Sequence, residues 1–361
     1  MDKTPVKLTA IANYWGPSPT GGDLPRATTV VAERARAIEA AGFDAISYAE
    51  FLEGDVFPPL MEIARATERV ELMTRVAGAF SRSPVLLASG AAWVDEVARG
   101  RFRLGIGAAV PHESAEYLGI PFDRPAARMR DTVTIIRALW GEDLPGVERL
   151  ADGRVRYPGS VIPVETARID LVPQRPVPIF LAAAGPLMLQ LAGELAAGVV
   201  LELTTPRFVE WAWEQIRIGA ARTGRDLTGF EMCVQSSWIN DTTATGRIDN
   251  RARQFHFTIT HAIDKEFHPA WERGGLAEEA RAVREAALGG DWAEAERLTE
   301  TLLWPKYAVR TSDLDSFWRW VDGHVAAGVT MLALPANVET LFGISLAAVK
   351  ERVATASQTV R

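Results

Sequence analysis

The chain is poor in cysteine and has no long apolar run. Cys233 is the single cysteine among 361 residues, so no disulfide can form within the chain, as is typical of a reducing compartment. No apolar run reaches the roughly 20 residues that a membrane-spanning helix needs. The opening residues, Met1 to Lys7, are polar and do not resemble a signal peptide. These absences predict a cytoplasmic protein without a membrane partner.

The motifs of several enzyme classes are missing as well. No HExxH motif, no pair of cysteines and no run of carboxylates indicates a metal site. The chain also lacks the GxxxxGKS/T phosphate loop and the GxSxG turn of serine hydrolases. A formal net charge of −7 argues against nucleic acid as a partner. We therefore expect a small-molecule substrate, with neither metal nor nucleic acid bound.

What the chain does contain is a regular alternation of strand-like and helix-like segments. Hydrophobic residues make up 48% and charged residues 24% of the sequence, as in a globular protein with a sizeable core. Helical patterns separate the strands, and a last helix is expected near Val338–Ala354. Eight strands that alternate with helices predict an α/β fold, a (β/α)8 TIM barrel, as a single domain over residues 1–361. The expected strands are Leu8–Ala12, Ala45–Ala49, Leu72–Val76, Phe102–Gly107, Val177–Ala183, Gly198–Leu203, Phe230–Ser237 and Thr330–Leu334.

Two stretches exceed a minimal barrel, and we expect both at the carboxyl-terminal face of the strands. Residues 141–175 are rich in glycine, proline and charge and predict an irregular excursion. Residues 241–310 contain the run LAEEARAVREAALGGDWAEAERL and predict a mainly helical insertion. Such insertions form lids or substrate walls, or they pack on the outside of a barrel, or they make a dimer contact. The sequence leaves these alternatives open.

Residues 83–109 predict a helix that leads into a buried strand. Ser83 suits the cap of this helix and Pro84 its first turn, where a missing N–H costs nothing. Two glycines, Gly105 and Gly107, leave the carboxyl end of the strand without side chains. A flat or bulky ligand can therefore lie against the backbone there, where α/β enzymes bind their ligands.

The same stretch, SRSPVLLASGAAWVDEVARGRFRLGIGAA, resembles the central signature of the bacterial luciferase-like flavin and deazaflavin oxidoreductases. A second segment, VPIFLAAAGPLMLQLAGELAAG at Val177 to Gly198, resembles the phosphate-side motif of the deazaflavin-dependent branch. The resemblance implies a TIM-barrel oxidoreductase that uses coenzyme F420 or, alternatively, FMN. It also makes a homodimer the expected assembly.

The phosphate of the cofactor is expected at the second of these segments. A helix that starts at Gly185-Pro186 directly after a strand offers free N–H groups to an anion, although a Gly-Pro pair is also ordinary at turns. The resemblance implies that Ala184, Gly185, Pro186 and Leu187 line the phosphate.

The ring of the cofactor is expected at the ends of other strands. The resemblance implies a non-prolyl cis peptide between Arg75 and Val76 that supports the ring from behind. The alternative is an ordinary strand, with Arg75 in solvent or in an ion pair. The expected cofactor-binding set is completed by residues that follow the first and fourth strands, namely Asn13, Gly107 and Ala108.

Candidate proton donors follow the second and fourth strands. Glu50 matches the acidic residue after the second strand of the family, but Phe51 stands where many relatives have a histidine. Glu50 then serves as the acid, or its carboxylate fixes a neighbouring loop. Related deazaflavin reductases carry a glutamate at the position closest to Val110, and here His112 and Glu113 follow it. These two are either a displaced acid or solvated loop residues.

Three functions fit these residues, with Trp15, Phe51 and Trp238 as the expected substrate contacts. The first is an F420-dependent oxidoreductase that moves a hydride between the deazaflavin C5 and a C=C, C=O or C=N group, a pterin-like substrate included. The second is a monooxygenase that uses reduced FMN, against which the absence of a histidine at position 51 argues. The third is a non-catalytic barrel that binds flavin or deazaflavin.

Overall fold

The computed structural model describes residues 5–12, 27–50, 54–109, 114, 118–241, 250–263 and 269–359. Its main sheet has the strand order β3-β2-β1-β14-β11-β10-β9-β5-β4, in which β4 is the two-residue strand Ala77–Gly78. Strand β3 also pairs with β5, which closes the sheet. The pairings that join β1, β2, β3, β5, β9 and β10 in that series, and β11 with β14, are parallel. The expected (β/α)8 barrel is thereby confirmed. Its strands are β1 (Lys7–Ile11), β2 (Ala45–Tyr48), β3 (Glu71–Thr74), β5 (Phe102–Gly107), β9 (Ile179–Ala182), β10 (Gly198–Leu201), β11 (Glu231–Gln235) and β14 (Met331–Pro335).

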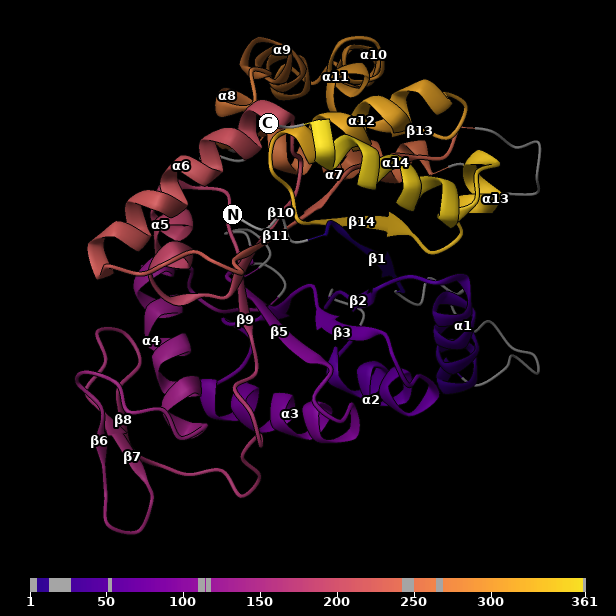
Figure 1. The fold of residues 1–361 in the computed structure, drawn as a ribbon. Helices are drawn as coiled ribbons and strands as arrows, with labels where there is room; N and C mark the ends of the chain where they lie inside the picture. Colours follow the sequence, from indigo (N-terminus) through magenta and orange to yellow (C-terminus); the bar gives the residue numbers. More distant parts are fainter. Residues whose placement is uncertain are drawn as a thin grey trace, which may run out of the picture. The chain divides into compact units, whose positions relative to one another are not determined.

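The chain divides into two compact units. The first unit consists of residues 9–183 and 191–200, and the second of residues 1–8, 184–190 and 201–361. In Figure 1 the first unit carries the indigo and magenta elements from β2 to β9, and the second carries the orange and yellow elements from α7 onwards.

In the first unit, helices alternate with the strands as the sequence predicts (Figure 1). The side-chain oxygen of Ser83 accepts a hydrogen bond from the Leu86 N–H at 3.2 Å and caps α3, and Pro84 occupies the first turn. Leu87, together with Ala91 and other members of the apolar stripe, is buried. The helices are α1 (Ala27–Ala41), α2 (Phe57–Ala66), α3 (Pro84–Val97) and α4 (Pro125–Leu139).

The excursion at residues 141–175 differs from its prediction in two respects. It contains a three-stranded antiparallel sheet, β6 (Glu148–Arg149), β7 (Val155–Tyr157) and β8 (Val164–Ala167), where we expected irregular chain. It also joins the end of α4 to the start of β9, so it lies at the amino-terminal end of that strand and not at the carboxyl-terminal face. The strands are too short for a recognisable alternation of polar and apolar residues.

In the second unit, helices also alternate with the strands, as the sequence predicts. They include α5 (Pro186–Leu195), which continues into the first unit, α6 (Pro206–Thr223) and α12 (Leu314–Ala326). The single helix expected near the C-terminus is instead two helices, α13 (Val338–Phe342) and α14 (Leu346–Thr359). Gly343 separates them because its φ of 69° cannot continue a right-handed helix.

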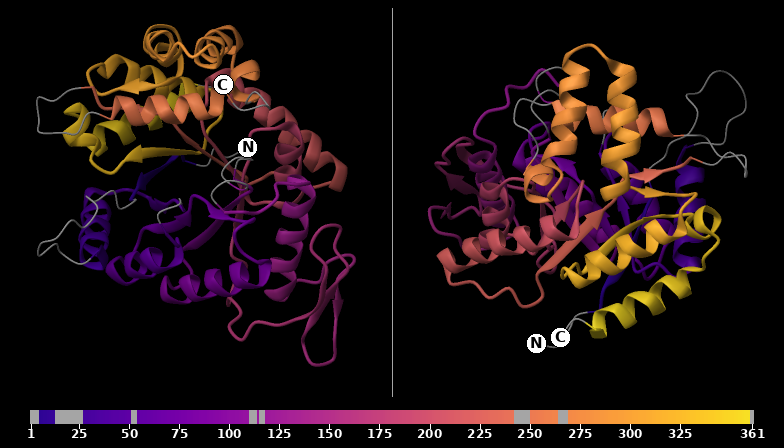
Figure 2. Two further views of the ribbon diagram at one scale, coloured as in Figure 1. Left: turned by 180° about the vertical axis from the view of Figure 1, so that it is seen from behind. Right: turned by 90° about the horizontal axis from the view of Figure 1, so that it is seen from above.

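The insertion after β11 is mainly helical, as expected. Its elements are α7 (Arg251–Ile263), α8 (Pro269–Arg273), α9 (Ala277–Leu288), α10 (Trp292–Leu298), a π-helix (Thr299–Leu303) and α11 (Trp304–Tyr307). Helices α9 and α10 lie side by side (Figure 2). The two ends of the insertion meet in a parallel pair, β12 (Trp238–Ile239) with β13 (Val309–Arg310). Asp241 reinforces this base through an ion pair with Arg310 at 3.2 Å and a hydrogen bond from the Ser312 hydroxyl at 2.7 Å.

Candidate functional site

The chain after β3 carries the expected non-prolyl cis peptide, between Arg75 and Val76. The Arg75 N–H donates to the Tyr48 carbonyl of β2 at 2.8 Å, and the Val76 carbonyl accepts from the Glu50 N–H at 3.3 Å. Arg75 is 4% exposed, so the alternative with Arg75 in solvent is wrong. Both sides of this peptide are therefore tied to the end of β2.

Two positions of β5 require glycine because atoms of neighbouring segments occupy the space of a side chain. The Thr74 hydroxyl donates to the Gly105 carbonyl and accepts from the Gly105 N–H, both at 2.7 Å, and a Cβ on Gly105 would overlap the Thr74 carbonyl. A Cβ on Gly107 would lie 2.6 Å from Val76 Cγ2 and 3.2 Å from Ala182 Cβ. Glycine at both positions allows β3, β5 and β9 to approach closely at their carboxyl ends.

Glu50, the candidate acid after β2, belongs to a charged cluster. Its carboxylate forms an ion pair with Arg82 and accepts a hydrogen bond from the Ser81 hydroxyl at 3.1 Å. Arg82 also pairs with the half-exposed Asp55 at 3.0 Å. Burial on its own would lower the pKa of Arg82, but the hydrogen bonds to Glu50 and Asp55 outweigh it and raise that pKa. The cluster holds the carboxylate of Glu50 in a fixed position.

The segment between β9 and α5 has the form that an anion site needs. Pro186 begins α5, and the Leu189 N–H is the first to bond back, to the Gly185 carbonyl at 3.1 Å. Leu187 is 68% exposed, and a Cβ on Gly185 would meet no atom within 4 Å. The backbone at this helix start is thus open to a ligand. Ala184 lies directly before it and is half-buried.

Polar residues and a tryptophan follow the end of β11. Ser236 donates to the carbonyl of the buried Tyr307 at 3.0 Å. Burial raises the pKa of Tyr307 to about 12, although its hydrogen bonds, including one with Ser237, act in the opposite direction. Trp238, an expected substrate contact, packs on Trp320 with ring centroids 5.3 Å apart. Its buried indole N–H has no hydrogen-bond partner within the described part of the chain.

Five of the residues expected at the site lie outside the described part of the chain. Ala108 and Gly107, by contrast, are described at the end of β5. Among the residues that the structure describes, no group of histidine, cysteine, aspartate or glutamate side chains could hold a metal ion. The residues outside it are Asn13, Trp15, Phe51, His112 and Glu113.

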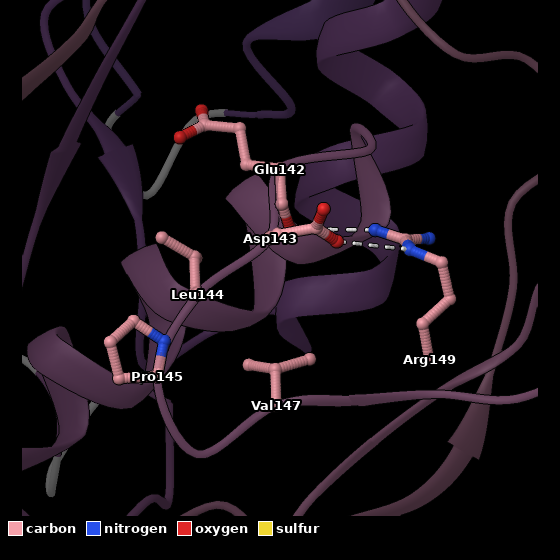
Figure 3. A pocket seen from close by; sticks show the side chains of 6 residues that line it. All are labelled: Glu142, Asp143, Leu144, Pro145, Val147 and Arg149. Atoms are coloured by element: carbon pink, nitrogen blue, oxygen red, sulfur yellow. Dashed lines mark hydrogen bonds and ion pairs between the residues drawn. The ribbon is translucent and has the colours of Figure 1, made fainter.

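A surface hollow of about 340 Å³ lies elsewhere, in the loop between α4 and β6 (Figure 3). Its charged side chains include an ion pair between Asp143 and Arg149 at 3.7 Å, and both residues are exposed. Solvent screens the attraction between two exposed charges, so such an ion pair contributes little free energy. The hollow contains none of the expected site residues. Its lining is Glu142, Asp143, Leu144, Pro145, Val147 and Arg149.

Sequence reasoning missed two features of these strand ends. Arg82 was part of the quoted signature, yet no pattern in the sequence assigns it to Glu50. Gln235 was counted only as a strand residue, and none of the described residues donates a hydrogen bond to its buried Oε1. Its position at the carboxyl end of a predicted barrel strand was the available signal.

Comparisons with known proteins agree with this architecture. A family model described as luciferase-like monooxygenase matches residues 15–321. A 5,10-methylenetetrahydromethanopterin reductase of Archaeoglobus fulgidus is 32% identical over 256 residues, 69% of this chain and 72% of that protein. A putative coenzyme F420-dependent oxidoreductase of Mycobacterium tuberculosis is 28% identical over 353 residues, 92% of this chain and 95% of that protein.

Solved structures of the same fold extend over nearly the whole chain. The coenzyme F420-dependent tetrahydromethanopterin reductase from Methanopyrus kandleri has a TM-score of 0.72 at 20% identity and covers 95% of this chain and 99% of that one. A monooxygenase from Streptomyces bottropensis has a TM-score of 0.60 at 19% identity and covers 95% of this chain and 99% of that one. At such identities the likeness shows the fold. The family match over most of the chain shows more: this protein belongs to the luciferase-like monooxygenase family and is an oxidoreductase.

Proposed function

We propose that the protein is an F420-dependent oxidoreductase that transfers a hydride between the deazaflavin C5 and a small organic substrate. The open backbone at Gly185, at the start of α5, is the observation that carries the proposal. It falls within the segment that resembles the deazaflavin motif. The relative of 28% identity is named as a putative coenzyme F420-dependent oxidoreductase, and the relative of 32% identity as a 5,10-methylenetetrahydromethanopterin reductase. When bound, the deazaflavin supplies the site that donates or accepts the hydride.

The residues of the chain fit such a group. Pro186 has no N–H to lose, and the first-turn N–H groups of Leu187 and Met188 have no partner within the helix. They are placed to bind a phosphate oxygen, with the helix dipole adding to the attraction. Gly107, which has no Cβ to meet the Val76 side chain, and Val76 itself would offer the ring an apolar support.

The first prediction concerns cofactor choice. We expect F420 to bind the cofactor-free protein at least about tenfold more tightly than FMN, a difference of about 1.4 kcal/mol. Two fluorescence titrations under the same conditions measure it. The reverse preference would favour a reduced-FMN monooxygenase, and binding of neither would contradict the proposal. Binding of F420 without turnover of any C=C, C=O or C=N compound would favour the non-catalytic alternative.

The second prediction concerns Glu50, which we propose as the group that takes up or releases the substrate proton. Glu50→Gln keeps the shape of the side chain but cannot exchange a proton at the carboxyl group. We expect kcat to fall at least about a hundredfold, the usual contribution of general acid–base catalysis, with an unchanged Kd for F420.

Asp55 provides a matched control, because it is the other carboxylate bound to Arg82. Asp55→Asn should leave kcat within about twofold. Equal effects of the two substitutions would mean that both carboxylates only hold Arg82, and His112 or Glu113 would then become the proposed acid.

The relatives also bear on the substrate. One is named as a reductase of a methylene-bridged pterin, which supports a pterin-like C–N centre among the reducible groups considered. We propose this class first, ahead of carbonyl compounds. Reduction of a methylene-bridged folate or pterin by F420H2, followed at the F420 absorbance band, tests it directly.

A homodimer is the proposed assembly, with α3 in the contact. Leu86 and Trp93 are 64% and 55% exposed and lie two helical turns apart on one face of this helix. The third prediction is that Trp93→Glu converts a dimer into a monomer in light-scattering measurements. Leu288→Glu, at an exposed leucine on α9, should leave the assembly unchanged. An unaltered mass for Trp93→Glu would exclude α3 from the contact.

A further inference from the structure

Gln235 carries a hydrogen-bond acceptor that nothing in the described structure satisfies. Its Oε1 is buried and has no hydrogen-bond partner among the residues that the structure describes, and the residue is the last one of β11. A buried acceptor without a donor costs about 1–3 kcal/mol, and native proteins retain few of them. An acceptor at the carboxyl end of a barrel strand lies where (β/α)8 enzymes bind their ligands.

The other residues on the same face of β11 show that this face is polar. Side chains alternate along a strand, so Glu231, Cys233 and Gln235 share one face, and Met232 and Val234 share the other. Glu231 forms an ion pair with Lys7 at 2.9 Å. Charged groups avoid the apolar layer between strands and helices, so the face of Gln235 is the one that turns to the barrel interior.

We propose that Gln235 is a ligand-binding residue whose Oε1 accepts a hydrogen bond from the imide N–H of the bound deazaflavin ring. The proposal rests on the proposed function and extends it to a residue outside the motifs that suggested the cofactor. A carboxamide oxygen is a good acceptor for an imide N–H, because both groups are neutral at pH 7. FMN has the same imide, so Gln235 strengthens binding of both cofactors and does not select between them.

The free protein and the complex respond in opposite ways to loss of this oxygen. In the free protein the acceptor has no donor among the described residues, so its replacement by an apolar side chain of similar length relieves a penalty. In the complex the same replacement leaves the imide N–H of the ring without an acceptor. A residue with a merely structural role would not combine higher stability with weaker binding.

The test compares the wild type with Gln235→Met and with a matched control, Thr132→Val. Thr132 lies on α4, and its hydroxyl is also buried with no hydrogen-bond partner in the described ranges of the chain. Thermal unfolding of the cofactor-free proteins and fluorescence titration with F420 give Tm and Kd for each. We expect Gln235→Met to raise Tm by about 2 °C and to weaken F420 binding about tenfold. Thr132→Val should raise Tm similarly and leave Kd within about twofold.

Each remaining outcome counts against a specific statement. If the wild type binds F420 and Gln235→Met leaves Kd within about twofold, the role of Gln235 is wrong and the proposed function stands. A lower Tm together with a weaker Kd would indicate general damage and would also overturn it. If the wild type binds neither F420 nor FMN, the proposed function fails, and the assignment of Gln235 fails with it.

Discussion

Asp131→Ala is expected to lower the free energy of unfolding by about 4 kcal/mol, the largest effect that we predict for a single substitution. Asp131 lies on α4 and is 1% exposed. Its Oδ2 accepts backbone hydrogen bonds from Ser160 at 2.8 Å, Val161 at 2.6 Å and Ile162 at 2.9 Å, and its Oδ1 accepts from the Tyr157 hydroxyl at 2.9 Å. Removal of the carboxylate leaves several donors unsatisfied at once.

Asp152 is the control for this prediction, since it lies in the same excursion but is exposed and accepts one backbone bond, from Arg154 at 3.1 Å. Asp152→Ala should cost less than about 1 kcal/mol. Urea unfolding measures both variants. A loss as small for Asp131→Ala as for Asp152→Ala would show that the hydrogen bonds of Asp131 contribute little to stability. Because the excursion meets β9 at its amino-terminal end, we expect Asp131→Ala to bind F420 normally at a temperature where it is folded.

The second large effect is a loss of stability below neutral pH, caused by His324. This residue of α12 is 1% exposed, and burial lowers its pKa from 6.5 to about 4, although its hydrogen bonds act in the opposite direction. Nδ1 lies 2.8 Å from the Trp320 carbonyl, which can only accept, so Nδ1 donates. Nε2 therefore accepts from the Thr204 hydroxyl at 2.9 Å, and the neutral ring uses both nitrogens.

The sign follows from the lower pKa in the folded protein. The unfolded chain takes up a proton near pH 6.5 and the folded chain only near pH 4, so the stability that neutral His324 contributes is complete above pH 6.5 and is lost as the pH falls towards 4. The expected loss between pH 7 and pH 5 is about 2 kcal/mol.

Chemical unfolding at several pH values checks this prediction. His324→Asn should reduce the change in the free energy of unfolding between pH 7 and pH 5, whatever the substitution itself costs in stability. The exposed His256 supplies the control, and His256→Asn should keep the wild-type dependence. A His324→Asn curve as steep as that of the wild type would assign the pH dependence to other groups.

The sequence by itself determined the order and kind of the barrel elements. Each of the eight expected strands is found, and boundaries such as Phe102–Gly107 are met to the residue. Ser83, Pro84 and the glycines of β5 were sufficient to predict this helix and strand. Helix caps and first turns depend on residues that are neighbours along the chain, and glycine is the residue that permits close approach of strands. The composition of residues 241–310 likewise predicted helices, since helical periodicity repeats within a few residues.

Tertiary structure decided the features that join distant parts of the chain. The antiparallel sheet of the excursion depends on donors that reach Asp131 from about 30 positions away, and no local pattern encodes such a bond. Three further features also depend on contacts between distant residues. They are the ion pair of Glu50 with Arg82, the low pKa of His324, and the Gln235 acceptor that has no donor among the described residues. Periodicity records which face of an element is buried, whereas a hydrogen bond or a shifted pKa depends on which atoms meet after folding.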